Sequence, residues 1–313
     1  MFASRRGWRC IALASGLVLA LSSGGYAGGN DDPNQDQAVQ PDEPTYPTTA
    51  FEDGAKSASV SVGDVTAGIS MVRRPEIDAN HDVPVLQVMV GGVRVLEVPG
   101  VPSGTDEPET EASIAKIDPA SRHPEVYFSS YSGGAHCCTH VIVAQQVGDK
   151  WVAVPIGDFD GDGRYIDDLA KDGVAEIVTV DSRFLYQFDC YACSSAPLLI
   201  YTVHAGKSVD VTTDKRFLPI HREYLKHLEE DADPDQRWSS AGFLAGWVAE
   251  KVHVGEGADA FKELTQHWDY GADVGEEVCT SGGEIDACDK KDRKIMKFPE
   301  RLKLFLQQSG YQF

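Results

Sequence analysis

The stretch that decides the fold is AEIVTVDSRFLYQFDCYACSSAPLLIYTVHAGKSVDV, residues 175–211. An earlier stretch, PEVYFSSYSGGAHCCTHVIVAQQVGDKWVAV at residues 124–154, has its parts in the same order. Each begins with an acid and a short apolar run, passes through a polar turn that holds two cysteines, and returns through a second apolar run to a glycine turn. Glu125 and Glu176 are 51 residues apart. Self-similarity at this spacing predicts a β unit that is used more than once.

The rest of the chain is organised around this duplication. Over residues 58–213, apolar runs flank turn signals at Gly91-Gly92, Gly148-Asp149 and Ala205-Gly206, which predict three hairpins. After residue 213 the apolar period becomes helical, and Pro299 suits the first position of a last helix. We therefore predict an α+β fold: a repeat-built antiparallel β domain, propeller-like or sandwich-like, followed by a helical C-terminal region at residues 214–313.

The N-terminal residues predict export. Arg5, Arg6 and Arg9 precede an apolar run and a small-residue end at Ala27, which is the pattern of a secretory signal over residues 1–27. The alternative, a retained anchor helix, is disfavoured because the run is too short to span a bilayer. Residues 28–57 are polar and acidic and predict a disordered linker. We expect a periplasmic or extracellular protein with no membrane span in the mature chain.

The charge narrows the class of partner. Removing the predicted signal takes away three arginines and no acid, so the net charge goes from −21 to −24. Such a chain repels nucleic acid and favours cations or basic partners, although high charge also simply maintains solubility. The expected partner is an unknown protein or a cell-envelope ligand.

Six cysteines remain after the predicted signal. An even number in an exported protein indicates disulfides, and six cysteines allow fifteen pairings. The symmetry of the duplicated stretches suggests a bridge between the first and second cysteine turns, and the last two cysteines are expected to close a local loop. In chain order these residues are Cys137, Cys138, Cys190, Cys193, Cys279 and Cys288.

Two Asp-rich segments precede or open the second stretch. Carboxylates at alternating positions with glycine at the bend can wrap a hard cation such as Ca²⁺, whereas the alternative is that Asp-Gly pairs only make tight turns. An EF-hand is incomplete here, because the twelfth position is Leu169. The candidate ligands are Asp158, Asp160 and Asp162 in the first segment and Asp168, Asp172 and Glu176 in the second.

These Asp-x-Asp-x-Asp-Gly turns, followed by a short apolar strand, resemble the FG-GAP or VCBS-type repeats of integrin-like β-propellers. The segments SGGAHCC at 132–138 and FDCYAC at 188–193 also resemble uncharacterised exported bacterial proteins. The resemblance implies calcium bound by the first, third and fifth turn positions and an acid at the ninth. This chain departs from the pattern at Ala170 and Ile166. The implied ion is structural.

Other kinds of functional site have weaker support in the sequence. His136 and His140 flank the first cysteine pair and could help to bind zinc or copper, but export favours oxidised sulfur. A redox role for the Cys-x-x-Cys turn would need a βαβ context, which is missing. Our first hypothesis is therefore a non-enzymatic binding or structural module. The alternative is a metal-assisted secreted hydrolase that uses His136 or the first Asp segment.

Overall fold

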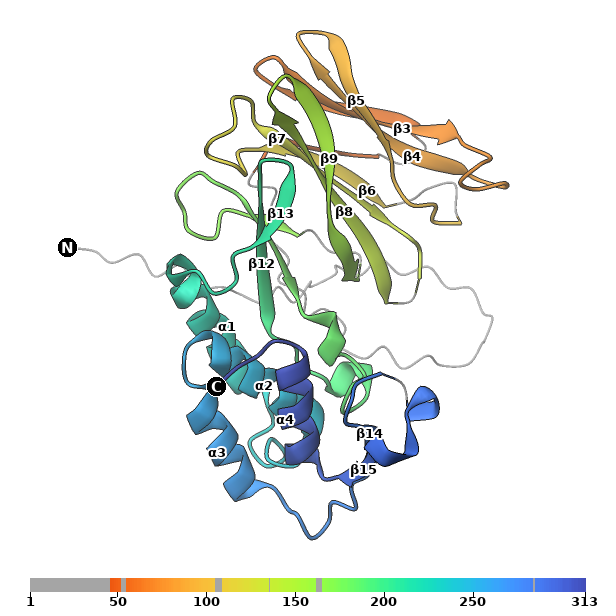
Figure 1. The fold of residues 1–313 in the computed structure, drawn as a ribbon. Coiled ribbons are helices and arrows are strands. Elements are labelled where there is room, and N and C mark those ends of the chain that lie inside the picture. The colour runs from red at the N-terminus through yellow and green to blue at the C-terminus, as the bar shows by residue number, and fades with distance from the viewer. Residues whose placement is uncertain (1–45, 52–54, 105–108, 135, 162–164, 284) are drawn as a thin grey trace, which may run out of the picture. The chain divides into compact units, whose positions relative to one another are not determined.

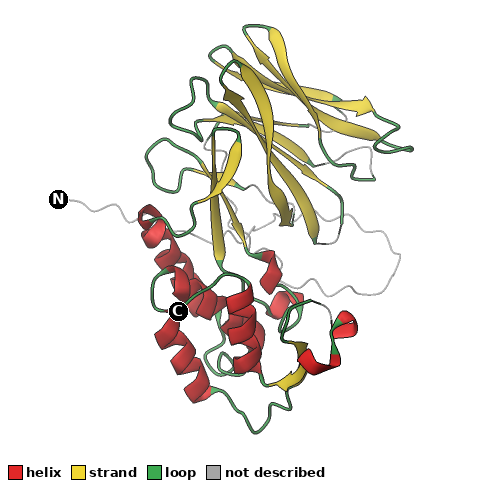
Figure 2. Cartoon of the chain, in the orientation of Figure 1, coloured by secondary structure: helices red, strands yellow, loops and turns green. Residues whose placement is uncertain are grey.

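The computed structural model describes residues 46–51, 55–104, 109–134, 136–161, 165–283 and 285–313. The predicted signal and residues 28–45 lie outside these ranges. Antiparallel sheets come first and a helical region follows, as the α+β prediction requires (Figure 1, Figure 2). The predicted linker is too long, because β1 (Thr48–Ala50) already pairs with β6 (Thr110–Ala115). Backbone hydrogen bonds hold such a strand, so its polar composition did not reveal it.

The strands of the β domain form three successive antiparallel meanders, each with its strands in chain order. Within each meander every strand pairs with the strand next to it in the sequence, and β1 adds to the edge of the second. The first sheet contains β2 (Ser57–Val62), β3 (Val65–Arg73), β4 (Asp82–Val90) and β5 (Val93–Pro99); the second contains β6, β7 (Glu125–Tyr131), β8 (Cys137–Val147) and β9 (Lys150–Asp160); the third contains β10 (Ile166–Asp167), β11 (Glu176–Val180), β12 (Leu198–His204) and β13 (Lys207–Asp210).

The duplicated stretches fold alike. β7, β8 and β9 repeat as β11, β12 and β13, and a cysteine pair follows the first strand of each set: Cys137 and Cys138 begin β8, and Cys190 and Cys193 lie between β11 and β12. Glu125 and Glu176 begin their strands, and each carboxylate accepts hydrogen bonds from the loop before it. Glu125 accepts from the backbone N–H groups of Ile117 (2.8 Å) and Asp118 (3.2 Å), and Glu176 accepts from that of Leu169 (3.2 Å). The 51-residue repeat is therefore a repeat of structure.

The three predicted hairpins are confirmed. β4 joins β5 at Gly91-Gly92, β8 joins β9 at Gly148-Asp149, and β12 joins β13 at Ala205-Gly206. At the last of these, φ is 50° for Ala205 and 78° for Gly206. Two-residue loops with positive φ at both positions match the right-handed twist of the strands, so the turn sets the register locally.

The second sheet is buried on both faces. Phe128 packs with Leu86 in the core shared with the first sheet, and its neighbour Tyr127 packs with Ile177 in the core shared with the third sheet. Successive side chains of a strand point to opposite faces, so an uninterrupted apolar run indicates burial on both. On the far side of the third sheet, Ile200 packs with Phe217, which leads into the helical region.

The helical region has a small hairpin and packs around a core that also includes Phe184 and Ala196 of the preceding β domain. Its helices are α1 (Leu218–Asp231), α2 (Ala241–His253), α3 (Gly257–His267) and α4 (Phe298–Gln308), and β14 (Glu276–Cys279) pairs with β15 (Arg293–Met296). Ser240 caps α2 by accepting a hydrogen bond from the N–H of Phe243 (3.3 Å). Pro299 lies in the first turn of α4, as predicted. Among the described residues, no helix is both long and apolar enough to cross a membrane.

Two glycines let α2 approach the second cysteine turn. A Cβ atom on Gly242 would lie 2.3 Å from the carbonyl oxygen of Cys193, and one on Gly246 would lie 2.2 Å from that of Ser195. The N–H of Ser195 also donates to the carbonyl of Gly242 (3.2 Å). The small-xxx-small spacing therefore allows close backbone packing between α2 and residues 193–196.

Candidate functional site

Each cysteine pair closes within its own turn. Cys137 bonds to its neighbour Cys138, and Cys190 bonds to Cys193 across the short 3-10 turn η2 (Tyr191–Cys193). The predicted bridge between the two turns is wrong. The 3-10 turn already brings the Cα atoms of Cys190 and Cys193 to 5.0 Å, which is within the usual range for a disulfide.

The third pair follows the prediction. Cys279 and Cys288 form a disulfide with a Cα separation of 5.8 Å. It closes the connection between β14 and β15. All six predicted cysteines are therefore oxidised, and only the partners of the central four differ from what symmetry suggested.

Aromatic rings bring the two central turns together without a bridging disulfide. The His136 ring stacks on the Tyr191 ring with centroids 4.1 Å apart, and the Tyr186 ring lies 5.3 Å from that of Tyr191. The Tyr191 hydroxyl also donates to Asp160. Burial and this carboxylate raise the pKa of Tyr191, so its hydroxyl stays a donor. We name this set the cysteine-turn surface: His136, Cys137, Cys138, Tyr186, Cys190, Tyr191 and Cys193.

The cysteine-turn surface is open to solvent. Tyr186 is 61% exposed, and its backbone has φ of 60°, a left-handed conformation that is uncommon for an aromatic residue. Cys137, Cys190 and Cys193 are exposed, while His136 and Tyr191 are partly buried. Exposed aromatic side chains that contact one another form an apolar patch, and such a patch on a protein surface usually has a function.

The first Asp segment borders this surface. Asp158 and Asp160 lie on β9, opposite His140 and Cys137 of β8. Asp158 lies 2.6 Å from Nδ1 of His140, and Asp160 accepts from Tyr191. They therefore belong to a strand and have partners there, which differs from the expected turn. Asp162 lies outside the described residues.

The second Asp segment is a separate loop before β11. Asp168 accepts from the N–H groups of Asp172 (3.0 Å) and Gly173 (2.9 Å), and Asp172 accepts from that of Val174 (3.0 Å). Glu176 is 1% exposed, and burial raises its pKa to about 7. Arg216 lies 3.8 Å from Glu176. The carboxylates thus shape their own loop, and calcium at this loop stays a prediction.

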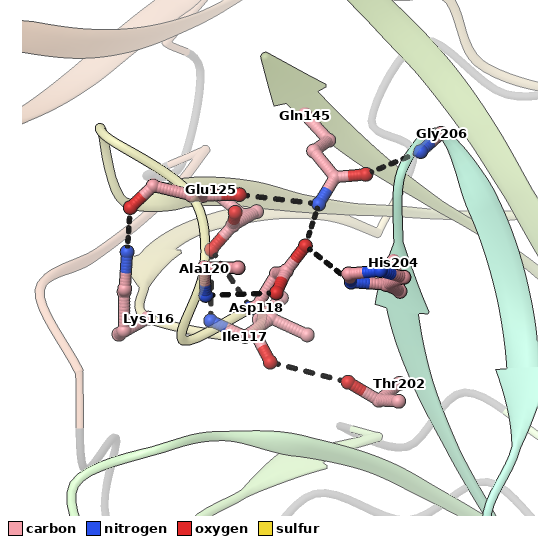
Figure 3. Close-up of polar contacts among 10 residues, drawn as sticks. Lys116, Ile117, Asp118, Ala120, Glu125, Gln145, Thr202, His204 and Gly206 are labelled. Atoms are coloured by element: carbon pink, nitrogen blue, oxygen red, sulfur yellow. Dashed lines mark hydrogen bonds and ion pairs between the residues drawn. The ribbon is translucent and has the colours of Figure 1, made fainter. Parts of the chain in front are cut away.

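A buried polar network, missed by the sequence analysis, joins the second and third sheets (Figure 3). Asp118 is 5% exposed and accepts from Gln145 (2.9 Å), from the N–H of Ala120 (3.0 Å) and from His204 (3.2 Å). Burial alone would raise the pKa of Asp118, but these partners hold it below its usual value. Gln145 in turn accepts from the N–H of Gly206 (2.7 Å), which fixes the β12–β13 turn.

A second missed group is the ion pair of His221 and Glu250. Glu250 is fully buried on α2 and lies 2.7 Å from Nδ1 of His221 on α1, while Nε2 of His221 lies 2.8 Å from the carbonyl oxygen of Thr212. Because both ring nitrogens face acceptors, both must donate, and the imidazole is charged. The N–H of Leu198 also donates to Glu250 (2.9 Å). The pair therefore ties two helices to β12.

This ion pair does not behave as a metal site. Two sets of three described residues lie close enough to share an ion: Asp189 with Cys190 and Cys193, and His221 with Glu250 and His253. In the first set the two sulfurs form a disulfide. In the second set both nitrogens of His221 already face acceptors. A thiolate or an imidazole lone pair is what a transition metal would need.

These features define an α+β protein with three disulfides among the residues that the structure describes, and the comparisons show its family. The chain is 32% identical to the probable thylakoid lumen protein sll0997 of Synechocystis sp. over 291 residues, which are 90% of this chain and 84% of that protein. The chain belongs to the family of that protein. A family model described as the sll0997 C-terminal domain matches residues 221–310, within the helical region.

The other comparisons add little about activity. The chain is 31% identical over 213 residues to the uncharacterized protein y4bJ of Sinorhizobium fredii, and this match covers 68% of the chain but 34% of y4bJ. No solved structure matches. The name of the Synechocystis protein places it in the thylakoid lumen. This chain is likewise an exported protein, periplasmic or extracellular, as its sequence predicted.

Proposed function

We propose that this chain is a non-enzymatic binding module whose cysteine-turn surface receives a basic segment of a partner in the periplasm or outside the cell. The observation that carries the proposal is the contact of three partly exposed rings, His136, Tyr186 and Tyr191, beside two disulfides. Exposed aromatic rings provide large contact area at low cost in conformational entropy.

The chemistry of the surface favours a cation. Tyrosine rings attract a guanidinium or ammonium group through the negative faces of their π systems. Asp158 and Asp160 lie at the border of the rings and can add ion pairs, and the net charge of −21 draws basic segments toward the chain. An arginine side chain can use both features, because its planar cation stacks on rings and forms paired hydrogen bonds with carboxylates.

The surface is also held in one arrangement before binding. Each turn is closed by a disulfide. The hydrogen bond from Tyr191 to Asp160 links the second turn to β9, where Asp160 lies opposite Cys137. Backbone contacts with Gly242 and Gly246 hold the second turn against α2. Groups that are ordered in the free protein lose less entropy when a partner binds, so such preorganisation favours affinity.

Titration with an oligo-arginine peptide tests this proposal, with an oligo-glutamate peptide as the negative control. The Tyr186→Ser variant should weaken binding about two- to fivefold, the share of one exposed cation–π contact. The matched control is Tyr270→Ser, because Tyr270 is also exposed (37%) but lies in the helical region. Both variants keep the net negative charge of the chain, so both keep its general electrostatic attraction for a cationic peptide. Equal affinities of the two serine variants would refute the proposed site.

Calcium remains part of the proposal as a structural ion at the loop of Asp168, Asp172 and Glu176. Carboxylate oxygens are the donors that Ca²⁺ prefers. A second observation in support is Tyr46, whose buried hydroxyl has no partner among the described residues and whose pKa is raised by burial and by these carboxylates. Thermal unfolding in calcium and in chelator tests this idea, and equal melting temperatures at saturating calcium would remove it.

The enzymatic alternative, a metal-assisted hydrolase, would use the same first Asp segment or His136. Asp158 pairs with His140, Asp160 accepts from Tyr191, and His136 stacks on Tyr191. Each of these groups already has a structural partner, which favours the binding hypothesis.

A further inference from the structure

A second surface feature lies in the helical region, far from the cysteine turns in the sequence. It is a pocket of about 150 Å³ between α1, the 232–240 connection, α2 and α3. Trp238, Phe243 and Trp247 are its aromatic lining residues. A cavity of this volume accepts a body the size of one six-membered ring, since an apolar cavity of about 150 Å³ binds benzene. The ligand must therefore be small.

The aromatic walls are fixed by their neighbours. The rings of Trp238 and Trp247 are perpendicular, with centroids 5.9 Å apart, and the Trp238 ring also stacks on His267 at 4.4 Å. The indole N–H of Trp247 donates to Glu229 (2.9 Å). Phe243 and Trp247 are four residues apart on α2, so they share one helix face. The pocket therefore offers rigid apolar walls.

The charges that line the pocket are of two kinds. Lys251 is paired, because its Nζ lies 3.4 Å from Glu229 and 3.1 Å from Glu256. Arg237 and Glu263 differ: within the described ranges, no oppositely charged side chain lies within ion-pairing distance of either. The Arg237 guanidinium stacks over the Trp238 ring at 4.9 Å. One unpaired cation and one unpaired anion thus line the same small cavity.

We propose that this pocket binds a zwitterionic amino acid with an apolar side chain. The side chain would lie in the pocket against its aromatic lining of Trp238, Phe243 and Trp247. Its carboxylate would bind the Arg237 guanidinium, and its ammonium group would bind Glu263. Guanidinium and carboxylate form strong paired hydrogen bonds, and a carboxylate accepts readily from an ammonium group. This site uses none of the contacts that support the cysteine-turn proposal, so each of the two proposals can be tested independently of the other.

Tryptophan fluorescence of the whole chain tests the pocket with three probes. L-phenylalanine carries both charges, N-acetyl-phenylalanine lacks the ammonium group, and phenylalaninamide lacks the carboxylate. We expect a saturable fluorescence change with L-phenylalanine, and Kd values about tenfold weaker or more for the other two, because each loses a charge-assisted hydrogen bond.

Two variants assign the charges. Arg237→Gln should weaken L-phenylalanine about tenfold and leave phenylalaninamide unchanged, whereas Glu263→Gln should weaken L-phenylalanine and leave N-acetyl-phenylalanine unchanged. Arg222→Gln is the matched control, because this exposed α1 arginine pairs with Glu256 and does not line the pocket. No saturable change with L-phenylalanine or L-leucine would overturn the proposal. So would equal affinities of Arg237→Gln, Glu263→Gln and the control for all three probes.

Discussion

Replacing Glu250 by glutamine should strongly destabilise the fold while changing very little volume. Glu250 is fully buried and bonds to His221 (2.7 Å) and to the N–H of Leu198 (2.9 Å). Glutamine can still accept through its amide oxygen, so the chief loss is the negative charge. His221 would then be a buried cation with no counter-charge from Glu250, unless it gave up its proton and one of its hydrogen bonds.

The size of the effect follows from burial. Removing one partner of a buried ion pair costs about 3–5 kcal/mol, because an uncompensated charge remains. That is a large part of the roughly 5–15 kcal/mol that stabilises an ordinary domain. Replacing both members, His221→Leu with Glu250→Leu, should cost less than the single change, since no charge is then left buried.

The pH dependence has a definite sign. Burial alone would lower the pKa of His221, but Glu250 and the Thr212 carbonyl raise it above 6.5, so its contribution is complete below 6.5 and is lost as pH rises through the folded value. Burial alone would raise the pKa of Glu250, but His221 and His253 hold it below 4.5. Its contribution is complete above 4.5 and is lost as pH falls through the folded value. The difference in the free energy of unfolding between the wild type and Glu250→Gln should therefore be largest between pH 4.5 and 6.5.

Urea unfolding followed by circular dichroism, with disulfides intact, measures this difference. The matched control is Glu230→Gln, an exposed α1 carboxylate that pairs with Lys226. It should change stability by only about 0.5 kcal/mol or less. A difference between wild type and Glu250→Gln that is below about 1 kcal/mol in the stated pH window, or that does not vary with pH, would refute the buried charge pair.

Three further predictions concern packing, burial and sulfur. Gly246→Ala should lower stability by about 1–3 kcal/mol in thermal unfolding, because the new Cβ atom would meet backbone atoms of residues 195–196. Alanine normally stabilises a helix relative to glycine, so a rise in melting temperature would contradict the close approach. Burial raises the folded pKa of Glu176 above its unfolded value, so the wild type should lose stability as pH rises from 4.5 to 7, in chelator, and Glu176→Gln should lack this loss. The stability of Glu176→Gln relative to the wild type should therefore rise by about 1–3 kcal/mol over this range, and a fall in that difference would count against the shift. Peptide mapping without reduction should find each disulfide within its own turn, and a cross-link between the two central turns would disprove the pairing.

Much of the fold could be predicted because its signals are local. Gly91-Gly92 and Ala205-Gly206 select two-residue turns, and such turns fix which strands pair. The spacing of Glu125 and Glu176 revealed the repeat, because the same acid performs the same task at the start of each set of strands. The change to a helical period after residue 213 has the same local character.

The candidate sites were harder to predict from the sequence, because they depend on contacts between residues that are far apart in the chain. The cysteine turns do meet, as the duplication suggested, but through the His136 and Tyr191 rings. Sequence symmetry could not tell a disulfide between turns from one within each turn, since both satisfy cysteine parity. The Asp118 network and the Trp238 pocket had no motif at all, because their members come from separate elements.

By itself, then, the sequence determined the parts: an export signal pattern, antiparallel meanders with their turns, oxidised cysteines and a helical end. Turn chemistry and apolar period act over a few residues, so they are readable in order along the chain. Only the tertiary structure decided which sulfur meets which, which acids are buried, and which rings face one another. Those outcomes depend on how sheets and helices pack against each other. A pattern along the sequence does not show which residues come into contact across a core.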